Sequence, residues 1–166
     1  MLEKRRGVIS PDEGEVVLSG GFGFISKLRG EENGGAFAIG EHPLEPGTLG
    51  APPHTHENED EISFVVEGRI GVLLGEEVHE VEAGGYVLKP RGIPHAFWNP
   101  GPGPARIVEI FSPAGFERYF EELAEILSAE GPPDVAAIGE LAARYGLTFH
   151  WERVEEISRR HNVELR

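Results

Sequence analysis

The chain has 166 residues, enough for one domain with a substantial core. It has no cysteine, which excludes disulfides, thiolate metal ligands and a cysteine nucleophile. Its 29 acidic residues outnumber the 15 basic ones and give a formal net charge of -14. Because a surface of this sign repels phosphate backbones and anionic lipid headgroups, neither nucleic acid nor a membrane is expected as a partner.

The start of the chain and the overall composition carry two further expectations. Residues 1–6 lack the apolar core of a signal peptide, and no stretch approaches the roughly 20 apolar residues of a membrane-spanning helix. A cytoplasmic protein is therefore expected. The sequence has no glutamine, one methionine and 13 prolines, a depletion of thermolabile residues that points to a thermophile.

Up to residue 112 the chain reads as short apolar segments separated by glycine and proline. This punctuation is typical of an all-β sandwich or barrel, so residues 1–112 are expected to form one β domain. The expected strands are 15–18, 24–28, 36–42, 61–66, 69–74, 77–81, 86–88, 95–99 and 105–111.

Four residues in this region have the character of metal ligands. His54 and His56 stand two apart, so that they point to the same side of one strand. Glu61 on a returning strand and His95 on a third can complete a shell of three nitrogens and one oxygen. This shell suits one divalent transition metal ion (Fe, Mn, Ni, Co, Cu or Zn) and leaves positions open for water, substrate or oxygen. The neighbouring acidic residues are expected to form a solvated loop, namely Glu57, Glu59 and Asp60.

The remaining residues, 113–166, are expected to form a helical extension packed on the β domain. Ser112 before Pro113 is a helix-start signal, and it is followed at helical spacing by Phe116, Phe120, Leu123 and Leu127. A second helix is expected from 132–134 to a stop at Gly146, and a third over 152–160. The helices either cover the outside of the β domain, roof its cavity mouth or join a dimer.

The spacing of the candidate ligand residues and glycines resembles the two motifs of the cupin superfamily. In the first motif, His56 is followed after four residues by Glu61 and after six more by Gly68. The second motif fits at each position: Gly84, Pro90, Gly92, His95 and Asn99. One departure is that six residues separate Gly47 from His54, where the family usually has five. The resemblance implies a cupin jelly-roll β-barrel, or double-stranded β-helix, followed by C-terminal α-helices.

Segments 34–37, 59–68, 116–120 and 144–147 also resemble a subgroup often labelled quercetin dioxygenase-like. This resemblance implies a metal-dependent dioxygenase acting with O2 on a small aromatic or enolic substrate, flavonol-like or polyketide-like. Glu61 is then either a fourth ligand or the base that takes a proton from the substrate. Six residues are expected to line the substrate pocket: Phe37, Ile39, Ser63, Val65, Phe97 and Phe111. Trp98, out of phase with His95, is expected to pack outward against a helix or a partner subunit.

Two other functions remain open. One is a metal-dependent isomerase or lyase acting on a sugar or keto acid, for which the candidate phosphate-binding groups are Arg69, Arg91 and Arg106. The other is a small-molecule-binding module without catalysis. Regulators of this kind usually carry a DNA-binding helical domain at one end. Fewer than fifteen residues precede the first expected strand here, which counts against this function. A homodimer is expected, formed by pairing of the edge strand 15–18 with a neighbouring chain.

Overall fold

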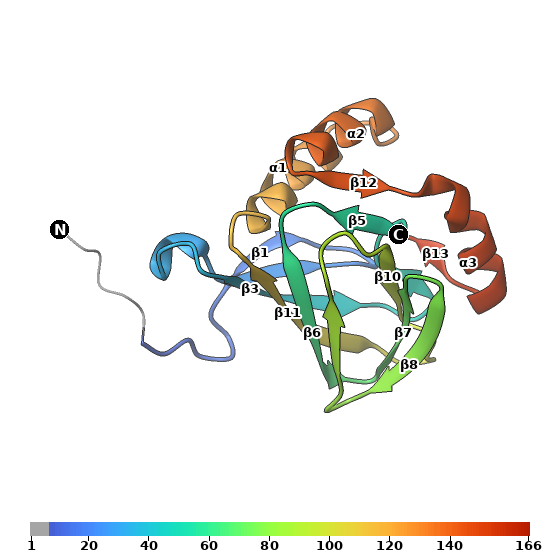
Figure 1. Ribbon diagram of the computed structural model, residues 1–166, viewed down its shortest axis with the longest axis horizontal. Helices are drawn as coiled ribbons and strands as arrows, with labels where there is room; N and C mark the ends of the chain where they lie inside the picture. The colour runs from blue at the N-terminus through green and yellow to red at the C-terminus, as the bar shows by residue number, and fades with distance from the viewer. Residues whose placement is uncertain (1–6) are drawn as a thin grey trace.

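Two β-sheets face each other in the computed structural model of the protein, which describes residues 7–166 (Figure 1). The prediction drawn from residues 1–6 lies outside the described residues. The two sheets have separate strand orders, so the fold is a two-sheet jelly roll rather than the closed barrel that the sequence predicted. Buried side chains of both sheets meet between them and form the core.

The first sheet has six antiparallel strands. In spatial order they are β1 (Glu15–Leu18), β2 (Phe24–Leu28), β3 (Ala38–Leu44), β11 (Ala105–Ser112), β6 (Asp60–Glu67) and β9 (Tyr86–Lys89). Burial alternates along β3, β6 and β11, because successive side chains of a strand point to opposite faces. The inner face therefore packs in the core, and the outer face points away from the second sheet.

The second sheet is built around β10 (His95–Trp98), which pairs with β7 (Arg69–Leu74) along one side. β7 continues to β8 (Glu77–Glu82). Along its other side β10 pairs with two short strands, β4 (Thr48–Leu49) and β5 (His54–His56). The C-terminal residues then add β12 (Leu147–Phe149) beside β5 and β13 (Glu164–Leu165) beside β4. The extension 113–166 is thus partly sheet, which the sequence did not predict.

Three α-helices lie in this extension: α1 (Glu117–Leu127), α2 (Val135–Arg144) and α3 (Val154–His161). A short 3-10 helix, η2 (Trp151–Arg153), precedes α3, and another, η1 (Gly30–Glu32), lies outside the extension between β2 and β3. The Asp134 side chain caps α2 by accepting a hydrogen bond from the Ala137 N–H at 3.0 Å, and Gly146 follows the helix with a φ of 65°. Within the described residues, none of the helices is long and apolar enough to cross a membrane.

Most boundaries differ from the prediction by one or two residues, and two of the differences have a clear local cause. The first helix begins at Glu117, because Ser112 still pairs with Asp60 in the first sheet and the chain must turn before the helix starts. Strand β3 begins at Ala38 instead of residue 36, because the Asn33 side chain accepts the N–H groups of Ala36 and Phe37 in a turn.

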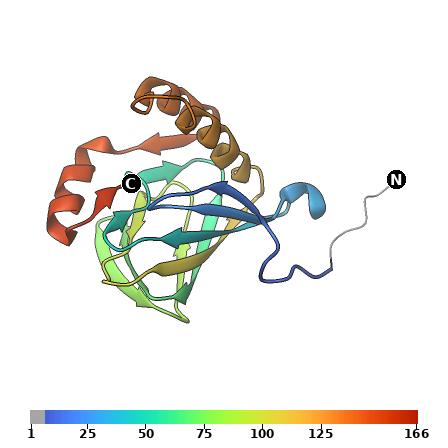
Figure 2. The same cartoon turned by 180° about the vertical axis from the view of Figure 1, so that it is seen from behind.

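The helices sit at one end of the sandwich and beside the second sheet (Figure 2). Phe120 of α1 stacks on Phe24 with ring centroids 4.1 Å apart, so α1 closes the end of the core. Trp98 points outward from β10 and packs on His161 of α3 at 4.4 Å, as predicted for an outward tryptophan against a helix. The extension therefore covers an end of the core as well as an outer surface.

Candidate metal centre

Strand β5 supplies two of the predicted ligands. His54 and His56 point to the same side of the strand and are 7% and 0% exposed. The Nδ1 atom of His54 lies 2.8 Å from the carbonyl oxygen of Pro52. Because a carbonyl oxygen can only accept, Nδ1 carries the hydrogen and Nε2 presents its lone pair to the interior.

His95 begins strand β10 and pairs directly with His54 across the sheet. Its Nδ1 lies 3.1 Å from the carbonyl oxygen of Ile93, which fixes the same tautomer as in His54. The preceding turn has Gly92 at a φ of 78°, and the Gly92 N–H donates to the carbonyl oxygen of His56 at 2.8 Å. The turn predicted at Gly92 thus ties the two histidine-bearing strands together.

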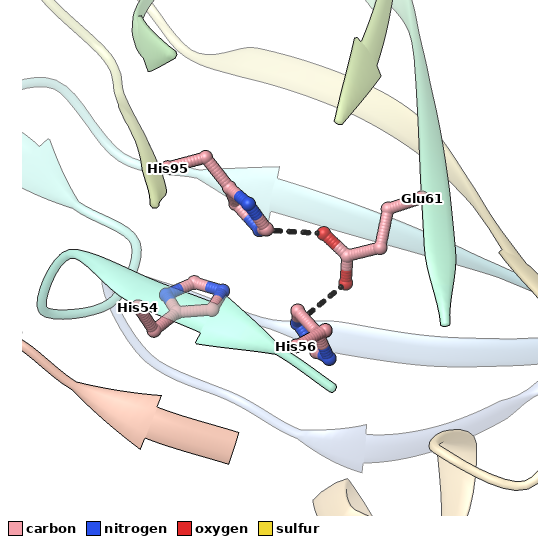
Figure 3. Close-up of side chains that lie close together, drawn as sticks. All are labelled: His54, His56, Glu61 and His95. Atoms are coloured by element: carbon pink, nitrogen blue, oxygen red, sulfur yellow. Dashed lines mark ion pairs between the residues drawn. The ribbon is translucent and has the colours of Figure 1, made fainter. Parts of the chain in front are cut away.

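Glu61 reaches the histidines from β6 in the opposite sheet (Figure 3). Its Oε1 lies 3.2 Å from Nε2 of His56, and its Oε2 lies 3.0 Å from Nε2 of His95. One ligand atom from each of His54, His56, Glu61 and His95 lies within 4.8 Å of the others, and all four residues are buried. The fold therefore brings all four predicted ligand residues to one point between the sheets.

The environment of these atoms fits a cation. The Nε2 atoms of His56 and His95 are buried and have no hydrogen-bond partner among the described residues, although a carboxylate oxygen lies near each. A nitrogen lone pair directed at a carboxylate is repelled unless a positive charge lies between them. Three imidazole nitrogens and one carboxylate oxygen are a donor set that divalent transition metals accept. These four residues fit such an ion.

The pKa values of the three histidines also indicate that the site favours a positive charge. Burial lowers the pKa of His54 and His95, so both are neutral and able to ligate near pH 7. Burial also acts on His56, but the carboxylates of Glu61 and Glu59 outweigh it and raise the pKa of His56 to about 9. Without a metal ion, a proton on His56 supplies the positive charge beside Glu61.

Glu59 corrects the prediction of a solvated acidic loop. It is only 7% exposed, and its Oε2 accepts from Nδ1 of His56 at 3.3 Å. Such outer partners orient a ligating imidazole and increase its basicity. Glu57 is exposed as predicted, and Asp60 pairs with Arg91 at 3.1 Å on the surface. The sequence held a sign that Glu59 differs from Glu57, because Glu59 stands three residues after His56 and can reach its ring.

A buried lysine lies directly behind Glu61. Lys89 of β9 pairs with Glu61 in sheet register and is 1% exposed. Its Nζ lies 2.8 Å from Oε2 of Glu61 and 2.8 Å from Oε2 of Glu109, which also accepts from Ser63 Oγ at 3.0 Å. Lys89 also lies 5.0 Å from the centroid of the Phe97 ring. Neither Lys89 nor Glu109 was predicted from the sequence, although strand alternation places them in phase with the buried Val87 and Ile107.

The two carboxyl groups that share this lysine differ in pKa. Burial raises the pKa of both, but in Glu61 the charges of Lys89 and His56 outweigh burial and hold the pKa well below its usual value. In Glu109 burial prevails over Lys89, and the nearby negative charge of Glu61 adds to it, which brings the pKa to about 7. Glu61 is therefore an anion throughout the neutral range, as a metal ligand must be.

Four of the six predicted pocket residues point into the sandwich: Ser63, Val65, Phe97 and Phe111. The prediction was wrong for Phe37 and Ile39. Phe37 is 36% exposed, and Ile39 lies on the outer face because it alternates with the buried Ala38 and Gly40. A shift of one residue in the expected phase of this strand moves its side chains to the opposite face.

Aromatic residues of the C-terminal extension lie over the site. The Phe116 ring centroid is 4.3 Å from that of His56, and the Phe149 ring centroid is 6.3 Å from that of His54. Phe149 is placed there because β12 pairs with β5. The sequence left three positions open for the extension, and the structure combines two of them: aromatic residues lie over the histidines, and α3 covers the outside of the second sheet.

Comparison with known proteins identifies the family. A family model described as a cupin domain matches residues 40–111, the region that holds all four ligand residues. The chain belongs to the cupin superfamily. An uncharacterized protein of Streptomyces coelicolor, SCO3923, is 31% identical over 103 residues, which are 61% of this chain and 91% of that protein.

Two further similarities concern proteins with a named role. The HTH-type transcriptional regulator PuuR of Escherichia coli is 34% identical over 116 residues, 64% of this chain, and the match spans 61% of the regulator's length. A solved structure described as a predicted oxalate decarboxylase from Thermotoga maritima aligns with a TM-score of 0.58 at 20% identity and covers 63% of this cupin and 97% of that chain. At this identity the structural likeness supports the two-sheet fold alone.

Proposed function

We propose that this cupin is a metal-dependent dioxygenase acting on a small aromatic or enolic substrate. The observation that carries the proposal is the convergence of three imidazole nitrogens and one carboxylate in a buried, partly aromatic site. One divalent transition metal ion per chain would be held by His54, His56, Glu61 and His95. When bound, such an ion supplies Lewis acidity and coordination positions for substrate and oxygen.

The residues of the chain define the remaining roles. Lys89 donates to Oε2 of Glu61 at 2.8 Å, which favours an anionic, fixed Glu61 and therefore the role of ligand over that of base. Phe116 and Phe149 exclude water from the histidine side of the site. The inward residues Val65 and Phe97 extend this apolar environment below the site and suit a planar, weakly polar substrate.

The test separates metal binding from oxygen chemistry. Protein loaded in turn with Fe, Mn, Co, Ni and Cu is assayed for oxygen uptake with a flavonol, a catechol and an enolic diketone. We expect uptake with at least one combination, and His54→Ala should abolish it together with the bound metal. The control is His79→Ala, which removes a half-exposed histidine outside the ligand set. Absence of oxygen uptake in every combination, with metal bound, would refute the dioxygenase.

A second candidate is a lyase or isomerase acting on a small keto acid, which the same set of three imidazoles and one carboxylate also supports. The arginines predicted for a phosphosugar do not serve this purpose, because each pairs with an acid at the surface: Arg69 with Glu80, Arg91 with Asp60 and Arg106 with Glu41. A keto acid needs fewer cationic groups than a phosphosugar. Turnover of such a substrate without oxygen would support this candidate against the dioxygenase.

A further inference from the structure

Strand β5, which supplies His54 and His56 to the metal centre, has little backbone pairing with the rest of the cupin domain. It is three residues long, and within the described part of the chain β10 pairs with it through one residue pair, His95 and His54. From the same side, the Gly92 N–H donates to the carbonyl oxygen of His56. Two of the four ligands therefore stand on a strand that this side of the sheet holds at two points.

The other side of β5 is paired along its whole length with β12 of the C-terminal extension (Figure 1). The residues of the two strands pair one to one: Leu147 with His56, Thr148 with Thr55 and Phe149 with His54. Beyond one end of β5, the Glu57 N–H donates to the carbonyl oxygen of Gly146 at 2.9 Å. Beyond the other end, the His150 N–H donates to that of Pro53 at 2.7 Å. The main support of the ligand strand thus lies beyond residue 111, where the match to the cupin domain ends.

The close approach of β12 at the Glu57 end requires a residue without a side chain. Gly146 has a φ of 65°, and a Cβ at this position would lie 2.6 Å from Nδ2 of Asn58 and 3.1 Å from Cβ of Glu57. A side chain here would therefore have to displace Asn58 and would crowd Glu57. The glycine that ends the second helix also sets how closely β12 approaches the ligand strand.

His150, the residue that follows β12, binds β5 through its side chain as well as its backbone. Its Nε2 lies 2.8 Å from Oγ1 of Thr55, the residue between the two ligands. Its N–H holds the carbonyl group of Pro53, and the neighbouring carbonyl oxygen, that of Pro52, accepts from Nδ1 of His54 at 2.8 Å. His150 therefore fixes the backbone on both sides of His54, including the segment that orients the His54 ring.

We propose that His150 is a positioning residue for the metal centre, through which the docking of β12 on β5 and the binding of the metal ion favour each other. This inference rests on the ligand set of the proposed function. Without the bonds from β12 and His150 the four ligands remain, but His54 and His56 are free to move, and the ion is bound less tightly. Because a coupling between two binding events is reciprocal, a bound ion holds β12 on β5 by the same factor.

The first test measures the dissociation constant of Co²⁺ by competition with a chromogenic chelator. His150→Ala and Thr55→Val each remove the side-chain bond, and each should raise the constant about 5-fold or more. Thr55 points away from the ligands, because neighbouring side chains of a strand alternate, so Thr55→Val takes no donor from the ion. The double variant should raise the constant no further than the larger single change, since both variants lose the same bond.

Two more variants separate positioning from a general loss of stability. His150→Gln keeps a hydrogen-bonding nitrogen near the place of Nε2 and should restore most of the affinity. His161→Ala is the matched control, because it removes another histidine ring of the extension, one that packs on Trp98 of β10 at 4.4 Å. We expect this control to lower the melting temperature and to leave the Co²⁺ dissociation constant unchanged.

Hydrogen exchange of the wild-type protein tests the reciprocal effect. Saturation with Co²⁺ should slow the exchange of the amides of residues 147–150 by about 5-fold or more, while the amides of α3 keep their rates. An equal slowing in both segments would mean that the ion stabilises the whole chain, which would overturn the proposal.

The same measurements distinguish a failure of the positioning role from a failure of the metal centre. If the wild-type protein binds Co²⁺ and the constants of His150→Ala and Thr55→Val stay within about twofold of it, the positioning role is refuted and the metal centre stands. If the wild-type protein binds no Co²⁺, the metal centre is wrong and the proposal is overturned with it.

Discussion

Removal of the Glu59 carboxylate tests how the site holds its metal ion. Glu59 accepts from Nδ1 of His56 at 3.3 Å and is 7% exposed, so Glu59→Ala removes a buried, charge-assisted hydrogen bond from a ligand. Such outer partners contribute about 10- to 100-fold to metal affinity. Because 3.3 Å is long for a hydrogen bond to a carboxylate, we expect the lower part of this range, about 10-fold, or about 1.4 kcal/mol.

The affinity is measured by competition between the protein and a chromogenic chelator for Zn or Co at fixed pH and ionic strength. Glu57→Ala is the matched control, because it removes the same charge from an exposed residue of the same loop. It isolates the general loss of negative charge from the hydrogen bond to His56. If the dissociation constants of Glu59→Ala and Glu57→Ala agree within twofold, Glu59 does not support the ligand and the reasoning is wrong.

Further variants probe the ligands, the core and the buried lysine. His54→Ala and His95→Ala should each remove most of the metal, as measured by elemental analysis, while circular dichroism shows a folded sheet structure. Burial lowers the pKa of His42 to about 4, so as the pH falls the unfolded chain binds a proton at this residue before the folded chain does. The free energy of unfolding of the wild-type protein should therefore fall by about 3 kcal/mol between pH 6.5 and 4. Denaturant titrations of His42→Phe should not show this loss. Lys89→Met leaves Glu61 and Glu109 without their shared cation. It should lower the free energy of unfolding of the metal-free protein by about 3 kcal/mol or more. The double variant Lys89→Met/Glu109→Gln should recover part of this stability, because it also removes one of the two unpaired buried charges.

The sequence predicted the ligand set because its geometry is mostly local. His54 and His56 share a face by strand periodicity, and the turn at Gly92 delivers His95 to the neighbouring strand. The family motif then relates these segments to Glu61, which lies on the other sheet. The longer strands of residues 15–112 were predicted because glycine and proline mark the turns between them, whereas the short strands β4, β12 and β13 were not predicted.

The residues that the sequence analysis missed depend on register between distant strands. Lys89 meets Glu61 because β9 pairs with β6, and Glu109 approaches both because β11 lies on the other side of β6. Nothing in the spacing along the chain gives these pairings. Ile39 was assigned to the wrong face because the inward positions of this strand hold the small residues Ala38 and Gly40, the latter packed by the Phe24 ring, while the larger apolar residue points outward.

The balance of buried charge explains why these missed residues matter for the metal. Glu59, Glu61 and Glu109 bring three carboxylates into the interior around the site, and Lys89 brings one ammonium. With all of them ionised, two negative charges remain, which the two positive charges of a divalent ion would offset. In the absence of the ion, the carboxylates of Glu61 and Glu59 raise the pKa of His56 to about 9, while burial, with the charge of Glu61 added, raises that of Glu109 to about 7, so both groups can hold protons near neutral pH. Metal binding therefore has to displace protons, and Lys89 sets how many negative charges the ion must balance.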